Sequence, residues 1–189
     1  MSDTHWIRTD RLLLRPFQQE DLGRLILLSH DQGFTSQFGS FQQPLDQSMA
    51  HAWIDSSNAS IQEDGRGHWA ILEHGQIVGV ASLLDHCLDG DPLSLTTIEY
   101  RLAQSARGRG LATEALSGLL EFGVAQLGIQ DFYAFISAEN AAAKNVAFKL
   151  SMTFLKRAFF AGHPVEVFHV RPTHGHPQTR FGRSAESAA

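Results

Sequence analysis

The segment Arg107-Gly108-Arg109-Gly110-Leu111-Ala112 decides the fold of this chain. It lies between an alternating segment at 97–103, which predicts a strand, and an amphipathic segment that predicts a helix to about Leu127. The first N–H groups of such a helix lack intrahelical acceptors, and the helix dipole adds partial positive charge there. Glycines allow an anion to approach the backbone closely. We therefore expect this turn to bind phosphate through its N–H groups.

Size and composition predict one domain with a single hydrophobic core. The 189 residues are 43% hydrophobic and 19% charged, and the formal net charge is −5. The basic residues are scattered, which argues against a nucleic-acid partner, and no apolar run approaches the ~20 residues that span a bilayer. Cys87 is the only cysteine. We expect a cytoplasmic protein with no internal disulfide, no membrane partner and no covalent intermediate on Cys87.

Hydrophobic periodicity predicts the element order β-α-α-β-β-β-α-β-α-β-β. Strands are expected at 7–17, 68–72, 77–84, 97–103, 131–136, 153–160 and 165–170. Helices are expected at 18–29, 46–61, 111–127 and 139–150. The fold class is therefore mixed α/β, with a central twisted sheet of about seven strands and helices on both faces. This single domain covers residues 1–171, and the Pro/Gly/Ser/His-rich segment 172–189 predicts a disordered tail.

This order, together with the 107–112 turn, resembles the GNAT superfamily of acetyl-coenzyme A-dependent N-acyltransferases. Arg107, Gly110 and Ala112 fit the family signature of Gln or Arg, two residues, Gly, one residue, and Gly or Ala. The segment at 98–102 resembles the strand that precedes the signature in this family. Three further segments resemble the branch that acetylates the N-terminal alanine or serine of ribosomal proteins: the "R-L-x-L-R-P" strand at 11–16, "A-T-E-A" at 112–115, and "E-N … K-L" at 139–150. The likeness covers about residues 6–171 and implies that the fourth and fifth strands splay apart.

The resemblance implies that acetyl-CoA is the co-substrate. Its pyrophosphate is expected on the N–H groups of 107–112, with Arg107 and Arg109 adding charge, and its pantetheine arm along the backbone of 100–102. The expected coenzyme-binding residues are Tyr100, Leu102, Arg107, Gly108, Arg109, Gly110, Leu111, Ala112, Asn140 and Asn145. From the residues alone, Asn140 could equally be a helix N-cap and Asn145 a solvated surface residue.

The catalytic residues are expected at the splay. The Leu102 N–H is the expected donor to the thioester carbonyl, Glu99 is the preferred general base, and Asn145 is expected near the departing sulfur. An alternative role for Glu99 is to face the substrate without transferring a proton. Secondary candidates for the base are His68, Glu166 and His169.

The chain departs from the branch pattern at three positions. Ala143 stands where the branch usually has Ser, Ser151 where it has Gly, and Ala147 where many relatives carry a tyrosine acid. The first and third departures leave the identity of any general acid open. A thiolate is a good leaving group, so direct transfer in a ternary complex remains the expected mechanism.

The acceptor is expected to be a primary amine, either the N-terminal α-amine of a peptide or protein or the amine of a small molecule. It enters beside the 32–44 loop, where an aromatic wall is expected from Phe34, Phe38, Phe41 and Trp53, although aromatic residues in such positions also form cores. We expect a monomer or homodimer and no metal, since the ten histidines show no metal-binding spacing and His174 and His176 lie in the tail. The competing interpretation is a non-catalytic acyl-CoA-binding module of the same fold.

Overall fold

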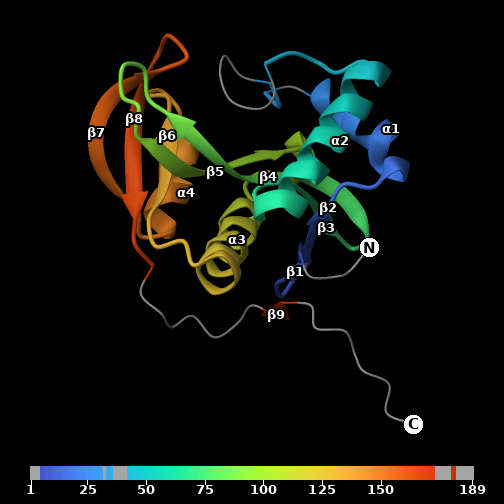
Figure 1. Ribbon diagram of the computed structural model, residues 1–189. Coiled ribbons are helices and arrows are strands. Elements are labelled where there is room, and N and C mark those ends of the chain that lie inside the picture. The colour runs from blue at the N-terminus through green and yellow to red at the C-terminus, as the bar shows by residue number, and fades with distance from the viewer. Residues whose placement is uncertain (1–4, 32, 36–41, 173–179, 182–189) are drawn as a thin grey trace.

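The computed structural model describes residues 5–31, 33–35, 42–172 and 180–181, and shows one mixed sheet with helices on both faces (Figure 1). Within this described chain the strand order is β7-β8-β6-β5-β4-β3-β2-β1-β9. The strands are β1 (Ile7–Arg8), β2 (Leu12–Pro16), β3 (Gly67–Glu73), β4 (Gln76–Cys87), β5 (Ser94–Leu102), β6 (Phe132–Ile136), β7 (Thr153–Phe160), β8 (His163–Val170) and β9 (Arg180–Phe181). The helices are α1 (Leu22–Ser29), α2 (Gln47–Asp64), α3 (Leu111–Leu127) and α4 (Ala141–Lys149), with short 3-10 helices η2 (Gln19–Asp21) and η3 (Gln104–Ala106). The expected fold class is confirmed.

The first predicted strand, 7–17, consists of two strands that fold back on each other. Ile7 pairs with Leu14 in an antiparallel ladder. The turn between them is closed by Thr9, whose N–H donates to the Leu12 carbonyl and whose hydroxyl oxygen accepts from the Leu12 N–H, both at 3.0 Å. The prediction of a single strand is wrong because this turn contains neither glycine nor proline, so the sequence carries no local signal for it.

The sheet has nine strands in the described chain where about seven were expected. The two-residue strands β1 and β9 account for the difference, and β9 pairs with β1 in the register Ile7 with Phe181. Arg180–Phe181 falls within the segment predicted to be a disordered tail, whereas 173–179 and 182–189 lie outside the described residues. The backbone there is therefore extended at one point of the predicted tail.

Helix α3 packs on one face of the sheet, and its small residues set the distance to the strands. The expected apolar face is buried, including Ala115, Leu119 and Gly123. A Cβ added at Gly123 would lie 2.8 Å from two ring atoms of Phe132, so only glycine permits this approach of helix and strand. Gly128 ends the helix in the left-handed conformation with φ 67°, as expected for a C-cap.

Helices α1 and α2 cover the opposite face (Figure 1). Asp46 caps α2 as expected, since its carboxylate accepts from the Met49 N–H at 2.8 Å. Trp53 of α2 stacks on the ring of His68 of β3, with centroids 4.4 Å apart. This face therefore carries β3, β4 and β5 side chains beneath α2, while alternate residues of the same strands face α3.

Candidate active site

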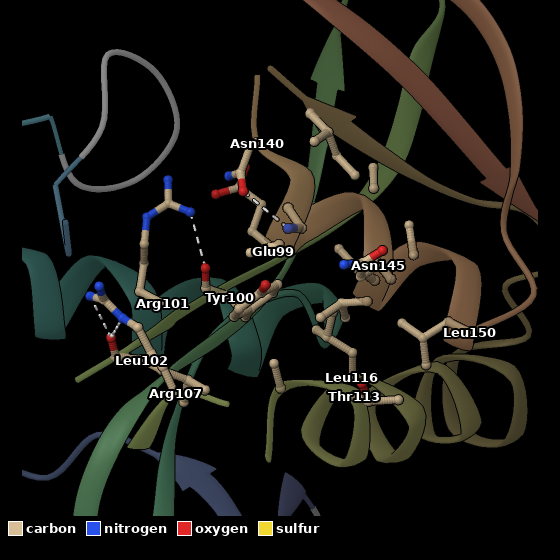
Figure 2. A pocket seen from close by; sticks show the side chains of 18 of the residues that line it. Glu99, Tyr100, Arg101, Leu102, Arg107, Thr113, Leu116, Asn140, Asn145 and Leu150 are labelled. Carbon is tan, nitrogen blue, oxygen red and sulfur yellow. Dashed lines mark hydrogen bonds between the residues drawn. The ribbon is translucent and has the colours of Figure 1, made fainter. Parts of the chain in front are cut away.

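Strands β5 and β6 separate from one another and leave a cavity between them. The two strands are fully described and parallel, and they are paired at one position only, Thr97 with Tyr133. A cavity of about 640 Å³ opens beyond this pair, bounded by β5, β6, the N-terminus of α3 and the inner face of α4 (Figure 2). The expected splay of the fourth and fifth predicted strands is therefore present, as β5 and β6.

Alternate backbone groups of β5 point into this cavity. The Ala103 N–H donates to a β4 carbonyl at 2.8 Å, so the backbone groups of Leu102 and of Tyr100 point the other way. The Leu102 carbonyl accepts from the Arg107 guanidinium at 3.0 and 3.1 Å, and the Tyr100 carbonyl accepts from Arg101 at 3.0 Å (Figure 2). The N–H groups of Tyr100 and Leu102 face the same space, where an extended ligand could pair with them.

The glycine turn forms the open end of the cavity. Gly108 and Gly110 have φ of 75° and 81°, and Gly110 is the N-cap of α3 with no side-chain hydrogen bond to the helix. Both glycines and the following Leu111 and Ala112 line the cavity. The N–H groups of the first turn of α3 are therefore presented to the cavity rather than to a capping side chain.

The two arginines of the turn have different roles. Arg107 lines the cavity, and its guanidinium lies on the Leu102 carbonyl. Arg109 instead donates two hydrogen bonds to the Glu73 carboxylate of β3, at 2.7 and 2.8 Å. The expectation that the Arg109 side chain adds charge to the cavity needs correction, because its guanidinium is directed to Glu73. Its backbone remains part of the turn.

A second ion pair fixes the start of α3 to the turn between β1 and β2. The Glu114 carboxylate accepts from Arg11 Nε at 2.6 Å, from the Arg11 N–H at 2.8 Å and from the Thr9 hydroxyl at 2.6 Å. Arg11 also donates to the Arg109 carbonyl at 3.1 Å. Burial raises the pKa of Glu114, but its hydrogen bonds and the charge of Arg11 outweigh this and lower it. The carboxylate near the helix N-terminus is thus neutralised by a cation.

Glu99 lies on the cavity wall and is held by a histidine of the neighbouring strand. Its Oε1 is 3.2 Å from Nε2 of His86 on β4, and both side chains are largely buried. Burial raises the pKa of Glu99, but the hydrogen bond from His86 and the positive charge of Arg101 outweigh it, so the pKa lies below its ordinary value. Glu99 is therefore a carboxylate at neutral pH.

The sequence over residues 11–153 matches the family described as acetyltransferase (GNAT) domain. The chain belongs to the GNAT acetyltransferase family. The resemblance drawn from the glycine turn and its flanking segments is confirmed, and so is the expectation of an N-acetyltransferase.

Solved structures of acetyltransferases share this fold. An acetyltransferase from Agrobacterium tumefaciens has 20% sequence identity and a TM-score of 0.72, with 88% of this chain and 94% of that chain covered. RimL, a ribosomal L7/L12 alpha-N-protein acetyltransferase in complex with coenzyme A, has 17% identity and a TM-score of 0.72, with coverages of 86% and 95%. The microcin C7 self-immunity acetyltransferase MccE, in complex with acetyl-CoA and AMP, has 19% identity and a TM-score of 0.70, with coverages of 86% and 93%. At these identities the likeness shows the fold alone.

Helix α4 brings the remaining GNAT positions to the cavity. Asn140 is the N-cap, since its side chain accepts from the Ala143 N–H at 3.0 Å, and it also lines the cavity (Figure 2). Asn145, Ala143 and Ala147 line the same wall. The positions at which the branch carries Ser and many relatives carry Tyr thus offer only methyl groups here.

The three secondary candidates for the base make other contacts. His68 lies under Trp53, with Nδ1 2.7 Å from the Ser82 hydroxyl, and burial lowers its pKa to about 4. Glu166 pairs with Lys144 at 2.7 Å, and His169 pairs with Asp131 at 2.8 Å. These contacts favour structural roles for all three.

The predicted aromatic wall is described only in part. Phe34 is fully buried in the main core, and Trp53 packs against that core between the rings of Phe17 and His68. Phe38 and Phe41 lie outside the described residues. Phe34 is therefore a core aromatic, and Trp53 is a partly buried one at the edge of the core.

His86 and the aromatic pair beside it were not among the residues predicted from the sequence. The His86 ring lies 4.9 Å from that of Phe160, which in turn lies 5.1 Å from that of Phe135 (centroid distances). Both Phe135 and Phe160 line the cavity. The alternation of strand residues 82–86 could have indicated His86. It lies on the same face of β4 as Ser82, and Ser82 is paired with Glu99 of β5.

Neither a metal site nor a membrane span is found in the part of the chain that the structure describes. No group of three or more His, Cys, Asp or Glu side chains there could hold a metal ion, and His174 and His176 lie outside it. No described helix is long and apolar enough to cross a membrane. Cys87 is exposed and lies outside the cavity, with Sγ 3.7 Å from the Pro92 carbonyl.

Proposed function

We propose that this GNAT domain transfers the acetyl group of acetyl-CoA to the N-terminal α-amine of a peptide or protein, by direct attack in a ternary complex. One observation carries the proposal: the cavity between β5 and β6 continues into the uncapped first turn of α3. A ligand that is anionic at one end and extended at the other fits such a space. Acetyl-CoA has this form, and it is bound in the structure of the acetyltransferase MccE, whose fold this chain shares.

The donor is held by backbone groups. Its pyrophosphate accepts from the N–H groups of 108–112, and its pantetheine amides pair with the β5 groups of Tyr100 and Leu102. Arg107 contributes charge at the rim, and Asn140 and Asn145 of α4 hydrogen-bond the arm or the sulfur. All of these residues except Arg109 line the cavity, which supports the assignment.

The reaction forms one C–N bond and breaks one C–S bond. The neutral amine attacks the thioester carbonyl, whose oxygen becomes negative and is stabilised by the Leu102 N–H. The nitrogen then gives its excess proton to Glu99 directly or through water, and the C–S electron pair leaves with coenzyme A as a thiolate that is protonated from solvent. Glu99 suits this step because it is a carboxylate at neutral pH, and orientation of the two reactants supplies much of the remaining barrier reduction.

The α-amine acceptor is inferred from the branch-like segments and from RimL, whose fold this chain shares. Arg11 and Glu114 of two of those segments form the ion pair that fixes α3. A small-molecule amine is the other acceptor class, and the experiment below distinguishes them.

Donor binding is tested by calorimetry on the Gly110→Leu variant. A side chain at φ 81° is strained and blocks the approach of phosphate, so acetyl-CoA affinity should fall by at least about tenfold. Gly90→Leu is the matched control, since Gly90 has φ 75° and open space around it outside the cavity. Unchanged acetyl-CoA affinity in Gly110→Leu would reject the donor site.

Catalysis is tested by incubating the protein with labelled acetyl-CoA and panels of peptides and small amines. We expect a mass increase of one acetyl group on peptide α-amines that Glu99→Gln strongly reduces. Acetyl-CoA binding without turnover on any acceptor would instead support the non-catalytic acyl-CoA-binding module.

A further inference from the structure

The cavity has two chemically different walls where β5 and β6 separate. Glu99 and Phe135 belong to one wall, on the face that also carries His86. Ile98 and Ala134, their neighbours along the strands, face the opposite side of the sheet because strand side chains alternate. Glu99 and the aliphatic side chains of Ile98 and Ala134 are therefore on opposite faces of the sheet, while the aromatic Phe135 shares the face of Glu99.

The apolar wall is closed by buried side chains from several elements. Ile98, Leu116, Ile136 and Met152 line the cavity and are 3%, 3%, 6% and 3% exposed. Figure 2 shows Leu116 and Leu150 on the α3–α4 side of β5, beside Asn145. Tyr100 and Asn145 also line the cavity on this side, so a ligand here meets mainly hydrocarbon, with these two polar side chains beside it.

Helix α4 contributes its smallest side chains to this wall. Ala143, Ala147 and Leu150 are spaced four and three residues apart and share one face of the helix. The two alanines project no atoms beyond Cβ, so they fill less of the cavity than larger side chains at these positions would.

The direction of the donor places its acyl end here. The phosphate-binding turn lies at the open end of the gap, where the strands are apart, and the paired residues Thr97 and Tyr133 close the other end. A donor that enters along β5 from the turn brings its thioester towards the closed end. The amine approaches on the Glu99 side, so the acyl tail must turn to the apolar wall.

From this geometry we propose that the donor site accepts straight acyl groups longer than acetyl, up to butyryl, with the tail on the wall formed by Ile98, Leu116, Ala147, Leu150 and Met152. The proposal rests on the proposed donor site. Transfer of a longer acyl group follows the same steps as transfer of acetyl. The amine nitrogen forms a bond to the acyl carbon, coenzyme A leaves as the thiolate, and one proton passes to Glu99.

Calorimetry with coenzyme A and its acetyl, propionyl and butyryl thioesters tests the proposal without an acceptor. Burial of one methylene group raises affinity about fourfold, and butyryl has two more methylene groups than acetyl. Butyryl-CoA should therefore bind at least as tightly as acetyl-CoA and up to about sixteenfold more tightly. Butyryl-CoA binding more weakly than acetyl-CoA would overturn it. If neither coenzyme A nor any thioester binds, the proposed donor site itself fails, which is a separate result.

Ala147→Leu tests the wall directly. The larger side chain fills the volume beside Ile98 and Leu116, so the ratio of butyryl-CoA to acetyl-CoA affinity should fall at least about fivefold. Ala125→Leu, on the exposed side of α3, is the matched control and should leave the ratio unchanged. An unchanged ratio in folded Ala147→Leu overturns the proposal. Should that variant not fold, the wild-type thioester series decides the question alone.

Discussion

Arg11 and Glu114 are separated by 103 positions in the chain, yet the Arg11 Nε lies 2.6 Å from the Glu114 carboxylate. The same carboxylate accepts from the Thr9 hydroxyl, and the same guanidinium donates to the Arg109 carbonyl. The pair thus joins the β1–β2 turn, the glycine turn and the first turn of α3. Two segments that resemble one GNAT branch, at 11–16 and 112–115, are explained by this single contact.

Removing this pair should cost stability and donor affinity together. A double-mutant cycle with Arg11→Ala and Glu114→Ala should give a coupling free energy of about 1 kcal/mol in chemical denaturation, since the arginine is half-exposed and partly screened. Acetyl-CoA affinity should fall severalfold because the glycine turn loses its support. The Arg66–Asp64 pair, at 3.6 Å with a half-exposed carboxylate, serves as control and should show coupling near zero. Equal coupling in both pairs would contradict the assigned role.

Gly123→Ala should destabilise the fold although alanine is the better helix former. The new Cβ would lie 2.8 Å from two ring atoms of the buried Phe132, and such overpacking costs about 1–3 kcal/mol. Gly23→Ala in α1 is the control, because nothing lies within 4 Å of its added Cβ, and it should stabilise by about 0.5–1 kcal/mol. Thermal denaturation measures both, and opposite signs are expected.

Glu99→Gln should lower kcat/KM by about 10²-fold or more while the affinity for acetyl-CoA stays within a factor of a few. The lowered pKa of Glu99 keeps its carboxylate ionised through mildly acidic pH. With a peptide acceptor, the fall in wild-type kcat/KM on the acid side should therefore reflect protonation of the acceptor α-amine, whose pKa is about 7.7–8.0. Steady-state kinetics across pH check this. Glu63→Gln, exposed on α2, should behave as wild type. Full activity of Glu99→Gln at every pH would exclude Glu99 as the base.

The free energy of unfolding should fall as the pH drops below 6.5, because burial lowers the pKa of His68 from 6.5 to about 4. Between these pH values the unfolded chain binds a proton at this position and the folded chain does not. The free energy of unfolding therefore falls by about 3 kcal/mol at most. His68→Gln should remove that part of the pH dependence in urea denaturation. The exposed His51→Gln should leave it unchanged.

Local sequence pattern was sufficient for most helices and strands and for the glycine turn that begins α3. The left-handed glycines, the α3 stripe and the Asn140 cap each depend on residues within a few positions of one another. Periodicity and capping chemistry report such short-range relations directly, which is why the GNAT resemblance could be drawn from them.

Side-chain partners across the sheet required the tertiary structure. Arg109 was expected in the cavity but lies on Glu73, and His86 was not considered although it holds Glu99. The fold-back of β2 on β1 and the addition of β9 to the sheet edge were likewise absent from the prediction. Each of these depends on segments far apart in the chain, and for the contact between His86 and Glu99 a shift of one residue in strand register would turn one side chain to the other face. The chain determined by itself where its glycine turn lies, because that turn depends on neighbouring residues, whereas packing decided which charged side chains face the cavity and that the two alanines of α4 line it.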